Sequence, residues 1–263
     1  MIENDNLRNT YNPDGSDLRC LQLRMLEILK EVDRICKKHD IPYWLSSGTL
    51  LGAIRHGGFI PWDDDLDIEM LRGDYLRFLS LLPDELPDQY ILQSDETDPN
   101  YVYLYAKIRD KNSYIKERCQ VNQSLRYQGA FVDVFPVEPS SLVLCKISAK
   151  LFNRLCFNQV LTTGIRRKVY SLSRFLLLNL LFPFFRYVSK LRNHHHLHHA
   201  LGVNFMDFRL HDEIFPLTSL TFEGSQFPVP NDVDSYLRRL YGDYWKIPDV
   251  KDVHMIDNEI KVW

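Results

Sequence analysis

The sequence predicts a mixed fold of the α+β or α/β class, in which helices and strands intermix along 263 residues. Two patterns of apolar residues indicate this class. In some segments apolar residues recur at every third or fourth position, as on one face of a helix, and in others they alternate or cluster, as in a strand. Because both kinds of segment are interspersed, we expect helices packed on a sheet. A composition of 45% hydrophobic and 25% charged residues is typical of a globular chain and argues against disorder.

The first long helix is predicted to begin at Ser16 or Asp17, either of which can cap it, and to end near residue 40, ahead of Pro42. A second helix is expected from Asp74, as its cap, to residue 82, where Pro83 stops it. The other elements expected in this half are a short helix at 48–55 and strands at 43–46, 65–70, 90–93, 102–108 and 130–135.

The second half of the chain begins with a mostly helical stretch at 142–192. A hairpin is expected at 221–229, with Gly224 and Ser225 in its turn. Asn231 is expected to cap a last helix at 232–241, which Gly242 ends.

Charge is distributed unevenly along the chain. The formal net charge of −3 excludes a strongly basic nucleic-acid binder, so no nucleic-acid partner is expected. Residues 139–206, however, contain ten Lys or Arg and neither Asp nor Glu, which leaves −13 for the rest of the chain. Such an asymmetry is typical of a surface that meets an anionic partner.

The five cysteines are scattered and form no CxxC pair, which fits a reducing compartment rather than a disulfide framework or zinc site. The N-terminal residues lack an apolar signal core. The longest apolar run, residues 175–185, is interrupted by Asn179 and Pro183, so we expect no transmembrane helix and a cytoplasmic protein.

The segment that carries the most chemistry is an acidic one. Asp63, Asp65 and Asp67 stand at every second position of a predicted strand, so their side chains share one face, while Leu66 and Ile68 point into a core. A cation would relieve the repulsion among these carboxylates, and hard oxygen ligands favour Mg²⁺ or Mn²⁺. Because magnesium sites combine one or two carboxylates with substrate phosphates, the pattern predicts metal-assisted phosphoryl chemistry.

Two other interpretations of the acidic segment need no such chemistry. An acidic, solvated turn before a strand stays open as an alternative. A calcium loop of the EF-hand kind is excluded, because its sixth position would be Ile68 rather than Gly and its twelfth Asp74 rather than Glu.

A turn upstream of the acids has the residues of a phosphate-binding loop. Ser47, Gly48 and Thr49 stand between the strand at 43–46 and the short helix. Small residues let backbone amides approach a phosphate, the helix N-terminus adds partial positive charge, and the hydroxyl groups can donate. The same turn could simply cap the helix.

Together these residues resemble the LicD family. The segment that carries the resemblance runs from the Gly48-Thr49-Leu50-Leu51-Gly52 turn through Arg55 to Pro61-Trp62-Asp63-Asp64-Asp65-Leu66-Asp67. The similarity extends to the first helix and to residues 129–136, and more weakly to 222–230 and 241–245. The resemblance therefore covers most of the chain outside its basic middle.

The resemblance implies a nucleotidyltransferase-like mixed sheet flanked by helices, with a basic helical insert. In that superfamily a Gly-containing turn precedes a D-x-D strand, which here is Asp65 and Asp67, and a third acid lies on a neighbouring strand, best matched by Asp133. These three are the implied catalytic residues and, with Asp63, the implied ligands of Mg²⁺ or Mn²⁺. The implied division is a catalytic core with the N-terminal helix at 1–138, the insert at 139–206, and a C-terminal hairpin and helix at 207–263.

LicD-like proteins transfer phosphocholine from CDP-choline to a sugar of a surface glycan, such as lipopolysaccharide or teichoic acid, or of its lipid-linked precursor, and fukutin-like relatives transfer ribitol phosphate. The resemblance therefore implies a metal-dependent transferase that takes a CDP-alcohol donor and releases CMP. Ser47, Gly48 and Thr49 are the expected contacts of the donor's phosphates, together with the cations Arg55 and Lys107. Two alternatives stay open, a nucleotidyltransferase that acts on a hydroxylated small molecule and a non-catalytic glycan- or membrane-binding relative.

The basic middle of the chain allows two hypotheses. Residues 142–192 could lie in an anionic membrane surface, which would place the protein at the inner face of the plasma membrane, or they could pack on the core and offset its acids. A histidine cluster follows the insert: His194, His195, His196, His198 and His199. With no acid or cysteine nearby, we expect a solvated loop or helix end rather than a metal site.

Overall fold

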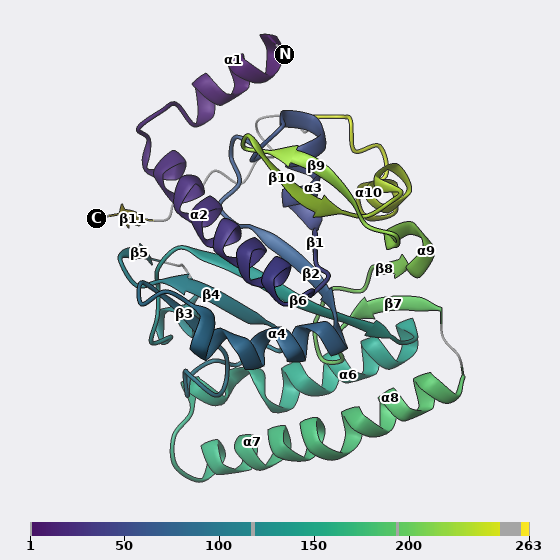
Figure 1. Ribbon diagram of the computed structural model, residues 1–263. Coiled ribbons are helices and arrows are strands. Elements are labelled where there is room, and N and C mark those ends of the chain that lie inside the picture. Colours follow the sequence, from purple (N-terminus) through teal and green to yellow (C-terminus); the bar gives the residue numbers. More distant parts are fainter. Residues whose placement is uncertain (1, 117–118, 193–194, 248–258, 263) are drawn as a thin grey trace.

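The computed structural model describes residues 2–116, 119–192, 195–247 and 259–262. Within them, seven strands form one mixed sheet in the order β1-β2-β6-β4-β3, with β7 paired to β6 and β8 to β7 (Figure 1). β2 and β6 are parallel, and the other pairs are antiparallel. The strands are β1 (Trp44–Leu45), β2 (Asp67–Leu71), β3 (Tyr90–Gln93), β4 (Ala106–Asp110), β6 (Phe131–Pro139), β7 (His196–His199) and β8 (Phe208–Leu210). The expected mixed sheet flanked by helices is confirmed.

The remaining elements surround this sheet. The helices are α1 (Ile2–Tyr11), α2 (Asp17–Lys38), α3 (Ser47–His56), α4 (Arg72–Glu85), α5 (Gln120–Gln123), α6 (Leu142–Leu155), α7 (Gly164–Leu176), α8 (Phe182–Leu191), α9 (His211–Ile214) and α10 (Val233–Tyr241). A 3₁₀ turn, η1 (Phe157–Leu161), follows α6, and a π turn, η2 (Leu177–Leu181), joins α7 to α8. Two small antiparallel pairs are β5 (Ser113–Lys116) with β11 (Glu259–Val262), and the expected hairpin β9 (Thr218–Phe222) with β10 (Ser225–Val229).

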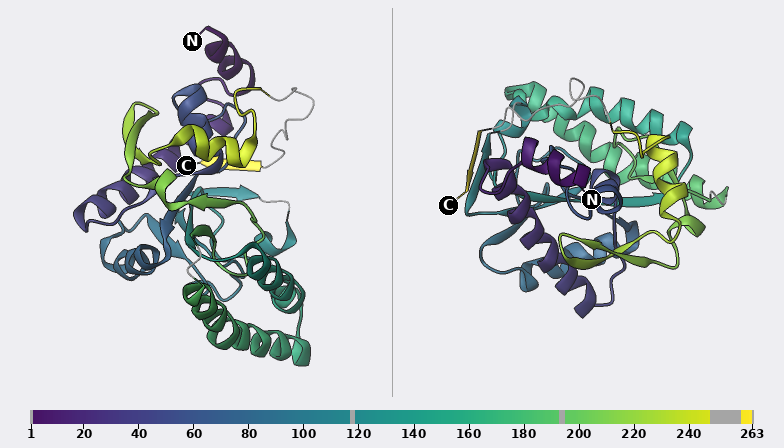
Figure 2. Two further views of the ribbon diagram at one scale, coloured as in Figure 1. Left: turned by 90° about the vertical axis from the view of Figure 1, so that its right-hand side faces the viewer. Right: turned by 90° about the horizontal axis from the view of Figure 1, so that it is seen from above.

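α2 is the helix that the sequence describes best. Ser16 caps it, because its hydroxyl oxygen accepts from the backbone N–H of Arg19 at 3.1 Å. The periodic apolar side chains, from Leu21 through Met25 to Ile35, are fully buried against the sheet. Ile68 and Val134 of the neighbouring parallel strands β2 and β6 belong to the same core. α2 and the insert helices α6 to α8 lie on opposite sides of the sheet (Figure 2, right).

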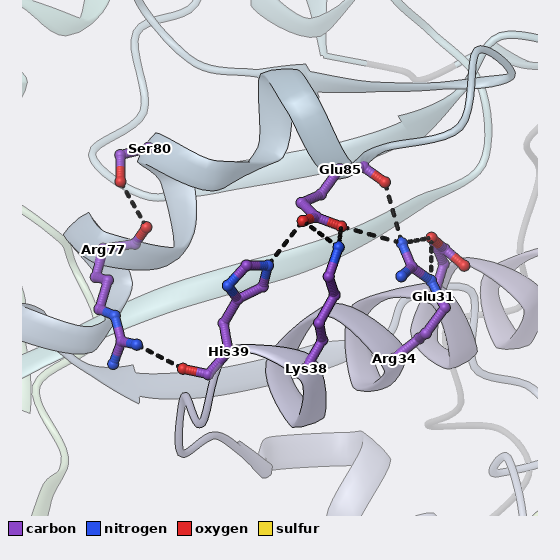
Figure 3. A network of polar contacts seen from close by, with 7 residues as sticks. All are labelled: Glu31, Arg34, Lys38, His39, Arg77, Ser80 and Glu85. Carbon is purple, nitrogen blue, oxygen red and sulfur yellow. Dashed lines mark hydrogen bonds and ion pairs between the residues drawn. The ribbon is translucent and has the colours of Figure 1, made fainter.

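A polar network on the surface joins the C-terminal ends of α2 and α4 (Figure 3). The Glu85 carboxylate accepts from Lys38 Nζ at 2.7 Å and contacts His39 Nε2 at 2.8 Å, and Arg34 lies 3.6 Å away. Hydrogen bonds from Lys38 and His39 lower the pKa of Glu85 to about 2. Because the lysine and arginine are exposed, water and salt screen the network, and it orients the two helix ends more than it stabilises them.

Several expected boundaries are wrong, and three of them have a clear physical reason. α4 begins at Arg72, not at Asp74, and continues through Pro83, since in the last turn a proline removes only one hydrogen bond. The last helix is capped by Asp232, not Asn231, because the Asp232 carboxylate accepts from the N–H of Ser235 at 3.0 Å. The strand expected at 102–108 is β4, and it begins only at Ala106, which pairs with Val134 of β6. Further along β6, from Val137 to Pro139, the pairing partner is β7 instead.

The insert contains one continuous helix, Gly164–Leu191, made of α7, η2 and α8. The expectation that Asn179 and Pro183 interrupt it is wrong. The π turn leaves backbone carbonyls without their usual partners, and Asn179 Nδ2 donates to the carbonyl of Phe175 at 2.9 Å. By length and composition this helix could cross a membrane, contrary to the expectation from sequence. Its inner face packs in a second apolar cluster with Cys145, Phe152 and Leu201.

The histidine cluster is not a solvated loop or helix end. His196 to His199 form β7, which continues the sheet beside the end of β6, and His198 and His199 are buried. The segment is extended because it forms backbone hydrogen bonds with the edge of β6 from Val137 to Pro139, which would otherwise be unpaired. His194 lies outside the described residues.

Candidate active site

Three of the predicted acids line one cavity. Asp63, Asp65 and Asp67 border a cavity of about 390 Å³ together with Ser47 and Gly48 at the start of α3. The expectation that all three lie on one strand is only partly right, because β2 begins at Asp67 and the other two lie in the loop before it. Hydrogen bonds from α2 hold this loop in place. Gln22 Nε2 of α2 donates to the backbone carbonyls of Ile60 and Asp63, at 3.2 and 3.0 Å.

The turn before α3 positions β2. The Thr49 hydroxyl oxygen accepts from the backbone N–H of Asp67 at 2.8 Å, and the backbone N–H of Ser46 donates to the Asp67 carbonyl at 3.1 Å. Thr49 is therefore buried under the strand, whereas Ser47, with φ of 49°, and Gly48 face the cavity. A Cβ atom on Gly48 would lie 2.7 Å from Asp63 Oδ2, so any larger residue would force this carboxylate to shift.

Asp133, on the neighbouring strand, does not border this cavity, but its carboxylate lies close enough to Asp65 and Asp67 to raise their pKa values. It lies directly opposite Asp67 in the parallel pair of β2 and β6, so both side chains share one face of the sheet. Lys107, opposite Asp133 on β4, donates from Nζ to Asp133 Oδ1 at 2.6 Å, and its ammonium lies 3.6 Å from the centroid of the Phe131 ring. The structure thus brings Lys107 into the site as the partner of an acid. Its expected contact with a phosphate stays a prediction.

Crowding and burial change the acidity of the cavity. Burial, together with the nearby carboxylates of Asp133 and Asp64, raises the pKa of Asp65 to about 6. Burial and repulsion also hold the pKa values of Asp63 and Asp67 well above their usual range. A divalent cation would reverse these shifts, because it favours the ionised carboxylates.

The residues present fit a magnesium or manganese ion that arrives with its substrate. Among the described residues, no group of three or more His, Cys, Asp or Glu side chains is placed to hold a metal ion by itself. Magnesium is usually bound through one or two carboxylates, with water and substrate phosphates as its other ligands. Asp65 and Asp67 supply such a pair, and Asp63 lies beside them in the cavity.

Arg55 does not line this cavity. It is half-buried at the end of α3, and its Nη1 donates to the backbone carbonyl of Tyr244 at 3.2 Å, so it ties α3 to the segment that follows α10. Burial lowers its pKa, and Asp63 opposes that change. Arg55 is therefore near the acids, and its contact with a phosphate stays a prediction.

A buried network beside the cavity was not predicted. Glu69, fully buried and two residues beyond Asp67, accepts from Trp44 Nε1 at 3.0 Å, Arg209 Nη2 at 2.6 Å and Tyr236 Oη at 2.9 Å, and contacts His199 Nε2 at 3.0 Å. Burial alone would raise the pKa of Glu69, but Arg209 and His199 lower it to about 2. The alternation that selected Asp65 and Asp67 also points to Glu69, although its partners are remote in sequence.

Part of the cavity lining is aromatic. Phe135, Phe205 and Tyr241 line it, with the carboxylate of Asp207 beside them. The Phe135 and Phe205 rings meet edge to face with centroids 5.7 Å apart. Arg209 also borders the cavity, but its guanidinium is bonded to Glu69. The cavity lining therefore combines carboxylates with aromatic side chains, which together suit a cationic group.

Comparison with known proteins relates this geometry to a family. Residues 40–159 match the family described as LicD/FKTN/FKRP, nucleotidyltransferase domain. The chain is 31% identical over 251 residues to the lipopolysaccharide cholinephosphotransferase LicD of Haemophilus influenzae, covering 89% of this chain and 94% of that protein. It is 41% identical over 58 residues to ribitol 5-phosphate transferase FKRP of Homo sapiens, and 37% over 69 residues to ribitol-5-phosphate transferase FKTN of Mus musculus. These two matches cover 22% and 26% of this chain and 11% and 15% of those proteins.

Proposed function

Because this chain belongs to the LicD/FKTN/FKRP nucleotidyltransferase-domain family and is a transferase of substituted phosphate groups, we propose that it moves phosphocholine from CDP-choline to a sugar hydroxyl of lipopolysaccharide or its lipid-linked precursor. CMP is the leaving group. Transfer of a phospho-alcohol follows from the similarity to LicD over nearly the whole of both chains. The choice of choline and of the acceptor is supported by the name of that relative, and choline also by the lining of the cavity.

The observation that carries the proposal is the convergence of Asp63, Asp65 and Asp67 on one cavity at the start of α3. The hydroxyl of Thr49 holds the backbone of Asp67, and Gly48 leaves room for Asp63. The donor's diphosphate is proposed to lie between the carboxylates and Ser47. Asp65 and Asp67 would hold magnesium there, and the ion would supply positive charge that offsets the charge developing on the departing CMP.

The protein's own groups orient the reactants. The acceptor's hydroxyl oxygen forms a bond to the β-phosphorus as the bond from that phosphorus to the CMP oxygen breaks. In this proposal Asp133 accepts the hydroxyl proton, and Lys107, 2.6 Å from it, holds that carboxyl in place. Asp65 and Asp67 would hold the cation that neutralises the donor's diphosphate.

The aromatic side of the cavity favours choline over a polyol. A trimethylammonium group has no hydrogen-bond donor, and it binds aromatic faces and carboxylates. Phe135, Phe205 and Tyr241 offer such faces, and Asp207 offers the charge. Ribitol would need hydrogen-bonding partners for its hydroxyl groups, and phenylalanine rings supply none.

The experiment incubates the protein with Mg²⁺, a lipopolysaccharide acceptor and CDP-choline, CDP-ribitol or CDP-glycerol, and measures CMP and pyrophosphate. We expect CMP from CDP-choline in preference to the other two donors. Asp65→Asn and Asp67→Asn are each expected to lower kcat by about 100-fold or more, because a metal ligand is lost. Asp64→Asn is the matched control, since Asp64 lies in the same loop outside the cavity lining and the change should leave most of the activity.

The same panel separates the alternatives. Release of pyrophosphate from CTP, with no CMP from any CDP-alcohol, would support the nucleotidyltransferase instead. If no donor is turned over by the wild-type protein, the non-catalytic relative is the better interpretation. Phe205→Ala should raise KM for CDP-choline by about tenfold, as expected for one cation–π contact, and leave the slower donors unchanged. An equal effect on all three donors would contradict the choline pocket while leaving phosphoryl transfer intact.

A further inference from the structure

The long helix Gly164–Leu191 exposes an apolar stripe to the outside of the molecule. The stripe follows helical spacing, and each of its side chains is between 43% and 81% exposed. Its members are Ile165, Val169, Leu172, Leu176, Leu180, Phe184, Tyr187 and Leu191. The helix forms the outer edge of the molecule, farthest from α1 (Figures 1 and 2, left). Single exposed apolar residues are ordinary, but a continuous stripe of this length marks a binding surface.

The π turn keeps the stripe on one face. Seven turns of a regular α-helix take about 25 residues, one fewer than separate Ile165 from Leu191. η2, at Leu177–Leu181, contains wider turns and takes up the extra residue. The outer side chains on either side of η2 therefore stay in line, and the inner residues Leu177 and Phe182 stay buried.

The inner face of the helix is anchored to the rest of the protein. Arg174 Nη2 lies 3.0 Å from Asp95 Oδ2, and Arg186 Nε lies 2.6 Å from Glu138 Oε2. These two ion pairs and the second apolar cluster hold the helix lengthwise against the core. Two of the ten basic residues thus offset acids of the core. This agrees, for these two residues, with the hypothesis that the insert packs on the core.

The other eight basic residues of the insert face solvent. Arg166, Arg167 and Lys168 lie at the start of the helix, and Lys190 and Arg192 at its end. Lys146, Lys150 and Arg154 lie on α6. None of the eight forms an ion pair with another described residue, and residues 139–206 contain no acid that could neutralise them. An apolar stripe flanked by exposed basic residues fits the surface of an anionic membrane. The stripe can enter the boundary of the acyl chains while the basic residues contact anionic head groups.

We propose that this face docks the protein on an anionic lipid bilayer, with the helix lying in the plane of the interface. The stripe would enter the boundary between head groups and acyl chains, and the basic groups would contact anionic head groups. The lengthwise anchoring argues for this orientation over a crossing helix, because a crossing would pull Arg174 and Arg186 from their partners and into the acyl layer. The proposal is independent of the donor and acceptor of the reaction.

The test is flotation of the full chain with vesicles of phosphatidylcholine alone or mixed with phosphatidylglycerol. We expect binding to the anionic vesicles that falls as salt rises. The triple variant Val169→Gln/Leu172→Gln/Leu180→Gln should weaken partitioning by about tenfold or more. The triple variant Arg166→Gln/Arg167→Gln/Lys168→Gln should weaken it by about 100-fold and abolish the preference for anionic lipid.

Control variants alter exposed residues on α2, on the other side of the sheet. Leu23→Gln, at a leucine 43% exposed, controls for the loss of apolar surface, and Lys30→Gln/Lys37→Gln controls for the loss of charge. Both should bind as the wild-type chain does. Far-ultraviolet circular dichroism of every variant confirms that the helices are intact, since all the substituted positions are exposed.

Three results would overturn the proposal. In the first, the wild-type chain stays with the unbound fraction at every lipid composition. The control variants lose binding as much as the stripe variants do. The chain forms a dimer that the stripe variants dissociate, in which case a second copy covers the stripe. Extraction of the membrane-bound chain with alkaline carbonate decides its orientation, because release supports an interfacial helix and retention supports a crossing.

Discussion

At the scale of single residues, the candidate site depends on how closely backbone and carboxylate can approach. Gly48 stands where α3 begins, and the Asp63 carboxylate occupies the space that a side chain would fill. Thr49, the next residue, uses its hydroxyl to hold the N–H of Asp67. One residue of the turn therefore makes room for an acid, and the next positions another. The sequence assigned both residues to the donor's phosphates, so these two roles were not predicted.

Gly48→Ala should impair catalysis more than folding. Its Cβ atom would meet Asp63 Oδ2 at 2.7 Å, so the carboxylate must shift. A misplacement of about 1 Å at a reacting group can cost about 100-fold, so we expect kcat/KM for CMP release to fall by ten- to 100-fold. Gly73→Ala is the control, since a Cβ atom there, in α4, meets nothing within 4 Å. Unchanged activity in Gly48→Ala would show that the position of Asp63 is unimportant.

At the scale of elements, the β9–β10 hairpin joins the N-terminal helix to the loop before the acids. Glu223, in the hairpin turn, accepts from Arg19 of α2 through both oxygens, at 3.1 and 2.6 Å, and from the backbone N–H of Phe59 at 3.1 Å. A Cβ atom on Gly58 would overlap Glu223 Oε1, so the contact requires glycine there. The hairpin therefore supports the loop that carries Asp63 and Asp65.

Glu223→Gln should destabilise the protein in a way that depends on pH. Arg19 and the Phe59 amide outweigh burial and lower the pKa of Glu223, so its stabilising effect is present above the usual pKa of about 4.5 and is lost as pH falls through the lowered value. We expect a loss of about 1–3 kcal/mol at pH 7, shrinking toward pH 3, in urea unfolding.

Glu85→Gln is the exposed counterpart of that change. The pKa of Glu85 is also lowered, but its donors Lys38 and Arg34 are open to water (Figure 3). We expect its effect on unfolding to be smaller and to vanish in high salt. If Glu223→Gln and Glu85→Gln lower the free energy of unfolding equally at high salt, the Glu223 contact is not shielded from solvent.

At the scale of the whole molecule, Glu69 links the two halves of the chain. Its carboxylate contacts Trp44 of β1, His199 of β7, Arg209 of β8 and Tyr236 of α10. Two of these bonds connect residues separated by 140 and 167 positions. The chain returns from the insert through β7 and β8 to this carboxylate, so the aromatic side of the cavity is held in place by the same network.

Glu69→Gln should therefore destabilise the whole protein rather than one element. Removing one member of a buried ion pair leaves the other charge uncompensated, at a cost of about 3–5 kcal/mol. We expect a single cooperative urea transition at lower midpoint, seen equally by tryptophan fluorescence and circular dichroism. The double variant Glu69→Gln/Arg209→Met should recover part of the loss, since it removes the unpaired guanidinium. A cost below about 1 kcal/mol for the single variant would contradict the buried network.

Much of the fold and part of the site follow from neighbouring residues. The helical spacing of Leu21 to Ile35 predicts α2 and its buried face, and the alternation around Asp67 separates acids from core residues. The expectations failed where a distant segment decided the outcome. The histidines at 196–199 carry no local strand signal, and they become β7 because the end of β6 lacks a partner. Asn179 and Pro183 read as helix breakers, but the second apolar cluster and a side-chain amide keep the helix continuous.

By itself, the sequence determined the acids of the candidate site, the turn that supports them and the family to which the chain belongs, because these depend on spacing along a few consecutive residues. Only the tertiary structure decided that Lys107 forms an ion pair with Asp133 and that Arg209 forms one with Glu69. The tertiary structure also decided that Phe205 and Asp207 line the cavity. It also decided which basic residues of the insert are paired and which are exposed. The physical reason is that backbone geometry sets which side chains share a face, whereas the order of strands in the sheet sets which remote residues meet there.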